Sequence, residues 1–505
     1  MQLTREACKQ LQSKTGLQVP ADHLLELPEK VLQFGTGVLL RALPDYFIDK
    51  ANKQGIFNGR IVVVKSTESD STAFDMQNGL YTVCVRGIES GKSVEENIIN
   101  ASVSRVLSAK SEWQIILKCA YNPDLKVVIS NTTEVGIQLV EDNIQADPPI
   151  SFPGKLLAFL YERFKAFGGT PESGLVIVPT ELITDNGTKL ESIVLELAHL
   201  NKLEFAFIEW LEQHNTFCNS LVDRIVPGKP NAAELKKLED ELGYADNLLT
   251  MSEVFRLWAI EGDEKVKETL SFAQVDTAVV ITPDITLFKE LKLRLLNGTH
   301  TFNCGISFLG GFNITREVVQ DDVFGRFTKE LMHKEIAPSI PFDIPVKQKE
   351  DFANSTFDRF CNPAIDHQLL SITVQYTSKM KMRNLPLIQR HYELSSNAPL
   401  RMAAGFAAFL LFMKVTRKDG NKYFGERDGV EYEIKDDSAA YFYEVWQQHE
   451  AAAVPAVVMQ NTALWEVDLT AYPGFLRAVE EQLNSMLTKG VAQTVAELEQ
   501  ASVTL

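Results

Sequence analysis

The chain has 505 residues, of which 45% are hydrophobic and 23% charged, and its 50 basic and 67 acidic residues give a net charge of −17. This length exceeds what one hydrophobic core usually accommodates, so two domains are expected. The acidic balance argues against a general affinity for nucleic acid or for anionic membranes, although local basic pockets for anionic ligands remain compatible with it. We therefore expect no nucleic-acid and no membrane partner.

The six cysteines are scattered without a Cys-x2-Cys pair, which predicts reduced and mostly buried thiols. The eight histidines form no His-x3-His pair, and no metal site is predicted. The amino terminus carries no apolar signal segment, and the longest apolar stretch, 403–413, is interrupted by Gly405 and too short to span a bilayer. A cytoplasmic location is the expectation.

An apolar stretch at 31–34 runs through a Gly-x-Gly turn into a helical pattern. In dinucleotide-binding turns the first glycine permits the tight turn, the second lets the backbone approach a pyrophosphate, and the helix amides point at the negative charge. The third glycine of that pattern is absent here. An ordinary structural turn is the alternative. The predicted cofactor-binding residues of this turn are Gln33, Phe34, Gly35, Thr36, Gly37, Val38, Leu39, Leu40 and Arg41, of which Arg41 would add a positive charge.

Strands and helices alternate along the first half of the chain. Buried strands are predicted at 60–64, 126–130 and 175–179, and helices at 105–120, 154–167 and 188–200. This alternation predicts an α/β fold with a Rossmann-like, doubly wound domain.

Polar residues that follow these strands are further candidates for the cofactor site. Glu68 and Asp70 would accept hydrogen bonds from the ribose of NAD, whereas Lys65 and Ser66 would suit the 2′-phosphate of NADP. After the strand at 126–130, the predicted cofactor-binding residues are Thr132, Thr133 and Glu134.

A domain boundary is predicted near 283, which gives a dinucleotide-binding domain at 1–283 and a mostly helical substrate and catalytic domain at 284–505. The segment 418–437 is polar and glycine-punctuated, which indicates an exposed loop or a small hairpin. The predicted helices of the second domain are 284–297, 315–334, 365–376, 398–416, 438–451 and 474–487.

Lys292, Asn297 and His300 recur at helical spacing. At ~100° per residue they fall at about 0°, 140° and 80°, so all three can line one broad helix face. A desolvated lysine can take or give the proton of a carbinol, while the amide and the imidazole hold the same oxygen. The alternative is an ordinary amphipathic helix with solvated polar residues.

Several segments, taken together, resemble the polyol-specific long-chain dehydrogenases, also called the mannitol dehydrogenase family. The family hallmark Lys-x4-Asn-x2-His stands here as Lys292, Asn297 and His300. The resemblance implies hydride transfer with NAD as cofactor and Lys292 as the general acid and base. The similar segments are 34–37 with Arg41-Ala42, 78–82, 132–134, 222–225, 253–258, 292–300 and 359–363.

Within the family, 179–183 and 360–372 look most like the branch that interconverts D-tagaturonate and D-altronate in hexuronate breakdown. This resemblance implies a sugar-acid substrate bound by Glu181, Asn186 and Lys379. One departure is Leu182, which stands where mannitol-type members have an asparagine that helps to hold the reacting oxygen; leucine cannot donate that hydrogen bond.

Another departure is Ser371, where an arginine is often found. The resemblance makes Lys379 the candidate partner of the substrate carboxylate, and a solvated place in the basic run 379–383 is its alternative.

Two further functions stay open. One is another activity of the same family, such as a fructuronate reductase or a mannitol- or arabinitol-type dehydrogenase. The other is a catalytically silent nucleotide-binding protein, because a fold does not fix a function. The sequence makes no prediction about the oligomeric state.

Overall fold

The computed structural model describes residues 1–66, 71–132 and 136–503, and the chain divides into two compact units. The first unit comprises 1–86 and 93–285, and the second comprises 87–92 and 286–505. The main division therefore follows Ile285, two residues beyond the predicted 283. The short segment 87–92 belongs to the second unit, which nothing in the sequence indicated.

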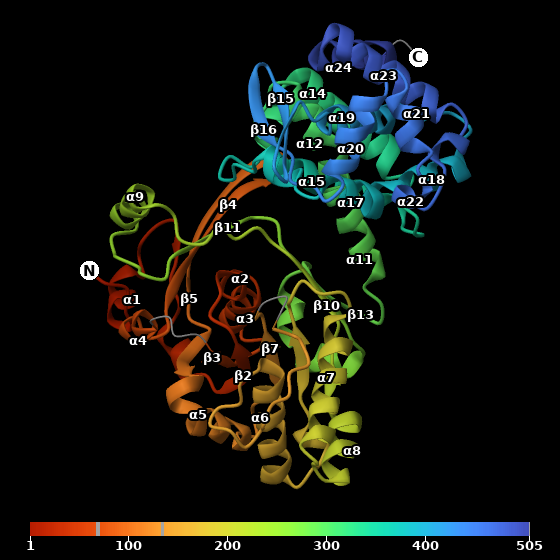
Figure 1. Cartoon of the computed structure of the whole chain (residues 1–505). Coiled ribbons are helices and arrows are strands. Elements are labelled where there is room, and N and C mark those ends of the chain that lie inside the picture. The colour runs from red at the N-terminus through yellow and green to blue at the C-terminus, as the bar shows by residue number, and fades with distance from the viewer. Residues whose placement is uncertain (67–70, 133–135, 504–505) are drawn as a thin grey trace. The chain divides into compact units, whose positions relative to one another are not determined.

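The centre of the first unit is a parallel sheet of six strands in the order β6-β3-β2-β7-β8-β9. In chain order this is the arrangement 3-2-1-4-5-6 of a doubly wound dinucleotide-binding fold, which confirms the predicted fold class. Strands β2, β3 and β7 of this sheet are labelled in Figure 1. The strands are β2 (Glu29–Phe34), β3 (Arg60–Lys65), β6 (Val103–Ser108), β7 (Val127–Ser130), β8 (Val176–Pro179) and β9 (Thr216–Phe217).

The strands of this sheet are buried on both faces, which explains their continuous apolar runs. Leu32, Val62 and Val128 lie in register and pack on one face with α5, α6, α7 and α8. Val31 and Val63 point to the opposite face, where α2 and α3 cover them. These helices are α2 (Val38–Ala42), α3 (Pro44–Lys53), α5 (Ala109–Lys118), α6 (Phe152–Phe167), α7 (Asn186–Leu200) and α8 (Phe205–His214).

The predicted helix at 105–120 is wrong over its first residues. Residues 103–108 form β6, which pairs in parallel with β3, and the helix α5 begins only at Ala109. Val103, Val106 and Leu107 are buried in this strand. The gain from burying them beside β3 is a tertiary effect that local helix propensity does not contain.

Two smaller sheets complete the first unit, in the orders β1-β5-β4-β11 and β10-β12-β13. Their strands are β1 (Leu17–Gln18), β4 (Tyr81–Glu89), β5 (Lys92–Asn100), β10 (Ser220–Asp223), β11 (Thr250–Glu253), β12 (Leu257–Glu261) and β13 (Val279–Thr282). The remaining helices are α1 (Arg5–Leu11), η1 (Asp22–Glu26), α4 (Thr72–Met76), η2 (Cys119–Tyr121), η3 (Pro171–Ser173), α9 (Ala232–Leu242), α10 (Glu264–Thr269) and η4 (Ser271–Val275).

The second unit is mostly helical, as predicted, and its core forms around α12 (Thr299–Leu309) and α19 (Leu400–Phe412) (Figure 1). The apolar stretch at 403–413 is almost entirely buried there. The other α-helices are α11 (Thr286–Leu291), α13 (Thr315–Gln320), α14 (Asp322–Glu330), α15 (Val346–Phe360), α16 (Leu369–Ile372), α17 (Tyr376–Lys379), α18 (Leu385–Leu394), α20 (Ala439–Gln448), α21 (Val454–Met459), α22 (Thr462–Trp465), α23 (Phe475–Lys489) and α24 (Val491–Val503), with the 3-10 turn η8 (Leu469–Ala471).

The predicted loop or hairpin at 418–437 is a three-stranded antiparallel sheet of β14 (Arg417–Asp419), β15 (Lys422–Arg427) and β16 (Val430–Glu433). All six cysteines are free thiols, and five of them are buried. In the described part of the chain, no helix has both the length and the apolar character that a membrane span requires.

Three segments of the second unit are π-helices, which the sequence did not predict: η5 (Lys292–Gly298), η6 (Leu331–Ile336) and η7 (Met380–Asn384). The predicted helix 284–297 is therefore α11 followed by η5. The predicted helix 365–376 is also broken, because Gln375 adopts a left-handed conformation with φ of 54° between α16 and α17. Short π-helical segments inside α-helices occur frequently at functional sites.

Candidate active site

The strand order of the six-stranded sheet reverses between β2 and β7, and ligands of such sheets bind outside the carboxyl ends of the strands at this point. Gly35 follows β2, and its N–H donates to the Val64 carbonyl at 3.0 Å. Asn131 follows β7, and its N–H donates to the Phe34 carbonyl at 3.1 Å. The glycine turn is thereby fixed where a nucleotide is expected.

Gly35 is required by the backbone itself. Its φ is +123°, and a Cβ at this position would lie 2.7 Å from the Asn131 carbonyl oxygen. Leu40, which replaces the third glycine of the usual pattern, is fully buried, and its Cδ1 would lie 3.0 Å from the same Cβ. The first glycine is therefore structural, and an apolar contact takes the place of the third.

Gly37 is different, because its φ of −60° suits any residue. The residue is exposed, and a Cβ built on it would meet no atom of the described residues within 4 Å. The open space beside Gly37 and the amide end of α2 fit the pyrophosphate of a dinucleotide, whose close approach a side chain here would block. Thr36 and Val38 are half-buried on either side of Gly37, and Leu39 packs against the core.

A buried polar cluster supports the turn from the side of α3. The Gln33 Nε2 atom donates to the Gly35 carbonyl at 3.4 Å and to the Asp45 carboxylate at 3.5 Å. The Tyr81 hydroxyl donates to the same Asp45 oxygen at 3.0 Å. Burial raises the pKa of Asp45 to about 7, against the lowering effect of these hydrogen bonds. The side chain of Gln33, predicted at the cofactor, thus supports the turn from behind.

Arg41 is turned toward the protein, although the sequence predicted that it would add charge at the cofactor. Its Nη1 atom donates to the Leu248 carbonyl, and its guanidinium carbon lies 5.5 Å from the centre of the Tyr81 ring. Burial lowers the pKa of Arg41. Phe34 likewise packs its ring into the core, 5.1 Å from that of Phe152. Both side chains therefore stabilise the turn, and only the backbone of the turn is left to contact a cofactor.

Glu181 is almost fully buried, and its carboxylate fastens the loops after β7 and β8 to each other. One oxygen accepts from the Thr132 N–H at 2.8 Å and from the Thr132 hydroxyl at 3.1 Å, and the other accepts from the Ser130 hydroxyl at 3.1 Å. Burial raises the pKa of Glu181. These bonds give Glu181 and Thr132 structural roles in joining the two loops. Their predicted contacts with the substrate and the cofactor stay predictions.

Asn186 is also internal. The residue is fully buried, and its Nδ2 atom lies 3.0 to 3.1 Å from the carbonyl oxygens of Pro179, Glu181 and Ser220. Its Oδ1 atom accepts from the N–H groups of Gly187 and Ser220, each at 2.9 Å. The amide has no capacity left for the predicted substrate contact.

Four further predicted cofactor residues, Glu68, Asp70, Thr133 and Glu134, lie outside the described residues. In the second unit, Lys292 and Asn297 lie on the π-helix η5, and His300 lies in the first turn of α12. In a π-helix the backbone bond joins residues five apart rather than four. One helical turn therefore separates positions 292 and 297, and their side chains emerge closer together than the 140° of an α-helix predicts. Both residues are half-buried.

The His300 ring is half-buried between two other rings. Its centre lies 4.3 Å from that of Phe360 and 5.0 Å from that of His367, with an angle of 76° between the two imidazole planes. Burial is the main cause that holds the pKa of His300 well below its usual value, and the charges of His367, Arg359, Arg383 and Lys379 add to it. Among the described residues we find no hydrogen bond to either nitrogen of this ring, so the neutral imidazole can still donate to a ligand.

Lys379 ends α17, and its Nζ atom donates to the Ile372 carbonyl at 2.9 Å. Burial and then Arg383 lower the pKa of Lys379. Arg383 lies on η7 and donates to the Thr301 hydroxyl at 3.3 Å. The structure thus brings Lys379 into the surroundings of His300 and adds a second cation.

The buried Arg294 links the two π-helices of this region. Its Nη1 atom donates to the carbonyls of Met382 and Arg383 at 2.8 and 2.7 Å, and its Nε atom bonds Glu290 at 2.9 Å. The widened π-turn of η7 is thereby fixed against η5.

Sequence reasoning quoted Arg359, Phe360 and His367 only as parts of similar segments and named none of them as site residues. The structure brings all three to His300. The similarity of the segments within 359–372 to the family pointed to these residues. The periodicity of the sequence, however, gave no reason to connect His367 with the helix of His300, some sixty positions earlier. Only the fold brings these segments together.

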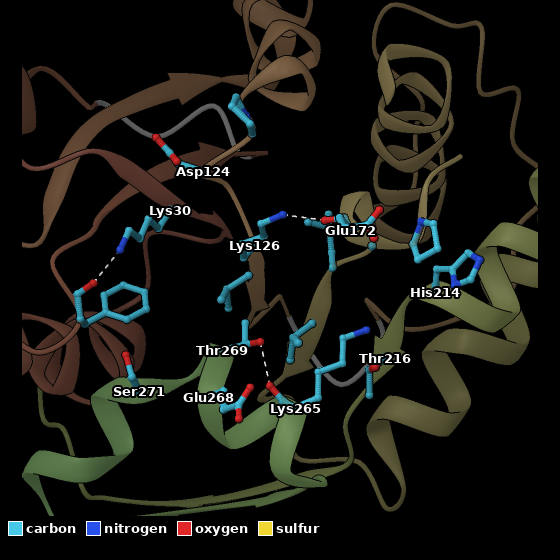
Figure 2. A pocket seen from close by; sticks show the side chains of 17 residues that line it. Lys30, Asp124, Lys126, Glu172, His214, Thr216, Lys265, Glu268, Thr269 and Ser271 are labelled. Atoms are coloured by element: carbon cyan, nitrogen blue, oxygen red, sulfur yellow. Dashed lines mark hydrogen bonds between the residues drawn. The ribbon is translucent and has the colours of Figure 1, made fainter. Parts of the chain in front are cut away.

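A pocket of about 430 Å³ lies at the opposite, amino-terminal edge of the parallel sheet (Figure 2). Lys30, Lys126 and Thr216 line it from the starts of β2, β7 and β9. The Nζ atoms of Lys30 and Lys126 already donate to backbone carbonyls, at 2.8 and 2.6 Å. This pocket contains none of the residues predicted for the cofactor or the substrate.

Comparisons with known proteins agree with this arrangement. The chain matches the mannitol dehydrogenase Rossmann domain over residues 29–274 and the mannitol dehydrogenase C-terminal domain over 284–487. It is 37% identical over 483 residues to the altronate oxidoreductases of Escherichia coli K12 and Shigella flexneri, with 94% of this chain and 97% of each relative covered.

Two solved structures share the fold. The Pseudomonas fluorescens mannitol 2-dehydrogenase, in a ternary complex with NAD and D-mannitol, matches with a TM-score of 0.66 and 24% identity over 99% of this chain and 100% of the other. A substrate-free D-sorbitol dehydrogenase matches with a TM-score of 0.79 and 21% identity over 98% of this chain and 100% of the other. The two-unit fold and the triplet of Lys292, Asn297 and His300 agree with these matches. The domain matches over most of the chain show that it belongs to the mannitol dehydrogenase family.

Proposed function

We propose that this protein is an NAD-dependent oxidoreductase that interconverts D-tagaturonate and D-altronate. The observation that carries the proposal is the set of Lys292, Asn297 and His300 on one π-to-α-helical segment, with cationic side chains around His300. Its 37% identity with altronate oxidoreductases over 94% of the chain supports the substrate.

The turn at 35–37 would hold the pyrophosphate of the cofactor. Gly37 leaves the space for it, while Gly35 and the cluster around Asp45 fix the backbone that approaches it. When bound, the nicotinamide supplies or accepts the hydride.

Lys292 moves the proton. In the reductive direction its ammonium donates a proton to the ketone oxygen of the substrate, and in the oxidative direction its neutral amine accepts the proton of the hydroxyl group.

Asn297 and His300 hold the same substrate oxygen. Among the described residues, no hydrogen bond involves the side-chain amide of Asn297 or the ring of His300. The lowered pKa of His300 keeps its imidazole neutral, with one N–H to donate. Leu182 is 62% exposed and cannot donate a hydrogen bond, so these two residues carry the stabilisation of charge on the oxygen.

The carboxylate of a uronate requires a local cation in a chain of net charge −17. Lys379 uses one ammonium hydrogen on the Ile372 carbonyl and keeps the others, and Arg383 adds positive charge beside it. We therefore assign the substrate carboxylate to Lys379.

The test follows NADH oxidation with tagaturonate, fructuronate and fructose side by side. Turnover of tagaturonate with the highest kcat/KM supports the proposal. A preference for fructuronate or fructose assigns the protein to another activity of the family, and dinucleotide binding without turnover of any of the three indicates a silent member. The same panel with NADPH checks the cofactor, since much faster turnover with NADPH contradicts the assignment of NAD.

A further inference from the structure

His367, the neighbour of His300 that the sequence did not single out, has no role in the proposed mechanism. It is half-buried in the loop before α16, and its ring stands edge to face on that of His300 with 5.0 Å between the centres. We propose that His367 is a specificity-determining residue whose imidazole contacts the carboxylate end of the sugar acid. This proposal rests on the function proposed above and assigns a further residue to its site.

The position of the His367 ring is set by the backbone around it. The carbonyl of His367 accepts from the Thr315 N–H at 3.0 Å, and the Leu369 N–H donates to the Asn313 carbonyl at 2.8 Å. A β-bridge joins Ile314 to Gln368 between these two bonds. The loop is therefore anchored on both sides of the ring, which needs no hydrogen bond of its own to stay in place.

The ring nitrogens of His367 accordingly have unused hydrogen-bonding capacity. Across the described ranges of the chain we find no hydrogen bond to either of them, and the same is true of His300 beside it. A neutral imidazole offers one N–H donor and one acceptor, and two half-buried rings with four unengaged nitrogens leave polar capacity that a ligand can satisfy.

The charges around His367 favour an anion. Burial is the main cause that lowers the pKa of His367, and the charges that add to it are those of Lys379 and Arg359, which are both positive. The charges that act on His300 come from His367, Arg359, Arg383 and Lys379, and all of them lower its pKa as well. At Lys379 the positive charge of Arg383, which lowers its pKa, has a larger effect than the negative charge of Asp436, which raises it.

Asp366, the acidic residue next to His367 in the sequence, does not offset these positive charges at the His367 ring. Asp366 is exposed and forms an ion pair with Arg316 at 2.8 Å. The surroundings of the two imidazoles are therefore electropositive although the whole chain carries −17. A bound carboxylate stabilises the protonated imidazoles, so its binding draws protons onto the site, and a neutral polyol has no such effect.

The experiment compares an acid and its neutral counterpart as ligands of the enzyme saturated with NADH, where no turnover occurs. The dissociation constants of D-altronate and D-altritol are measured by calorimetry for the wild type, His367→Gln and His367→Asn. We expect the wild type to prefer altronate, and both variants to bind altronate at least about tenfold more weakly with little change for altritol. Their amides can donate a neutral N–H but cannot take up the proton that the bound carboxylate draws onto the imidazole, so the charge-assisted hydrogen bond is lost.

Calorimetry in two buffers of different ionisation enthalpy provides a second readout. The wild type should take up protons on binding altronate, and the variants should take up fewer. His449→Gln is the matched control, because His449 is an exposed histidine of the same unit at the end of α20. Melting temperatures close to that of the wild type establish that the variants are folded.

Two outcomes overturn the proposal. One is a wild type that does not prefer altronate to altritol. The other is a variant that retains the preference or loses both ligands equally, which would mean that His367 only supports the ring of His300. The proposed function fails on a different result, namely that the wild type binds altronate but does not turn over tagaturonate with NADH.

Discussion

Lys292 and Asn297 are joined by one i to i+5 step of the π-helix that begins at Lys292 and ends at Gly298. An α-helix would separate their side chains by about 140°, and the wider π-turn brings them toward the same side. The neighbouring π-helix η7 is fastened to this one by Arg294, whose guanidinium donates to the carbonyls of Met382 and Arg383. The proposed proton-transfer group, Lys292, and the Asn297 amide are therefore placed by backbone geometry that the surrounding packing maintains.

Replacement of Lys292 by Ala should lower kcat by at least ~10²-fold, because a general acid and base is typically worth 10²- to 10⁴-fold. The dissociation constant of NADH should stay nearly unchanged, since the predicted pyrophosphate turn lies in the other unit. Steady-state kinetics and NADH fluorescence titration measure the two effects. Lys347→Ala, at an exposed lysine of α15 paired with Asp351, is the control. A Lys292→Ala enzyme with near wild-type turnover would refute the central assignment.

The two glycines of the turn should respond differently to substitution. Gly37→Val should fold normally and bind NADH much more weakly, because the new side chain meets no described protein atom but fills the space left for the pyrophosphate. Gly35→Ala should instead lower the melting temperature, because its φ of +123° and the 2.7 Å approach to Asn131 exclude a side chain. Calorimetry and thermal melts separate the two results. Unchanged NADH affinity in a folded Gly37→Val protein would mean that the turn is only structural.

Lys379→Met should reduce kcat/KM for tagaturonate by on the order of 10- to 150-fold, the equivalent of ~1.5–3 kcal/mol for a hydrogen bond to a charged group. A neutral ketose should be affected little, because the apolar stem is retained and only the charge is lost. Lys381→Met is the matched control, since Lys381 lies two positions away and pairs with the exposed Glu466 at 2.8 Å. Equal losses on both substrates would show that Lys379 contacts shared hydroxyl groups or supports the fold.

Asp45 should make the stability of the protein fall between about pH 4 and pH 7. Its pKa rises from the ordinary 3.8 to about 7 on burial, so the folded state binds more protons than the unfolded state within this window. The destabilisation is absent below pH 4 and complete above pH 7. Each pKa unit is worth about 1.4 kcal/mol, so the effect is on the order of a few kcal/mol.

Asp45→Asn removes this titration. The melting temperature of the variant minus that of the wild type should therefore increase as the pH rises from 4.5 to 8. Differential scanning calorimetry at several pH values follows the difference. Asp351→Asn, at an exposed aspartate, should give a curve parallel to that of the wild type. Parallel curves for Asp45→Asn as well would show that Asp45 titrates near its ordinary pKa in the folded protein.

The sequence by itself determined the sheet, the glycine turn and the chemistry of the residues proposed for catalysis. Runs such as Ile61 to Val64 are apolar on both faces, and only a covered parallel strand buries both at once. Gly35 predicts a tight turn, because its φ of +123° and the close Asn131 carbonyl exclude a side chain, whereas Gly37 predicts room for a ligand beside the backbone. The identities of Lys292, Asn297 and His300 fix what each group can donate or accept, whatever surrounds them.

The tertiary structure alone decided which polar groups are free to meet a ligand. Glu181 and Asn186 follow a predicted strand and carry suitable chemistry, yet their hydrogen bonds are used within the protein, on Thr132 and Ser220 among others. Arg41 donates to a carbonyl some two hundred positions later in the chain, and the ring of His367 meets that of His300 because the fold brings their segments together. A local sequence pattern predicts which residues are buried and what each side chain can donate or accept. The partner of a hydrogen bond, in contrast, depends on which distant segment the fold brings within about 3 Å.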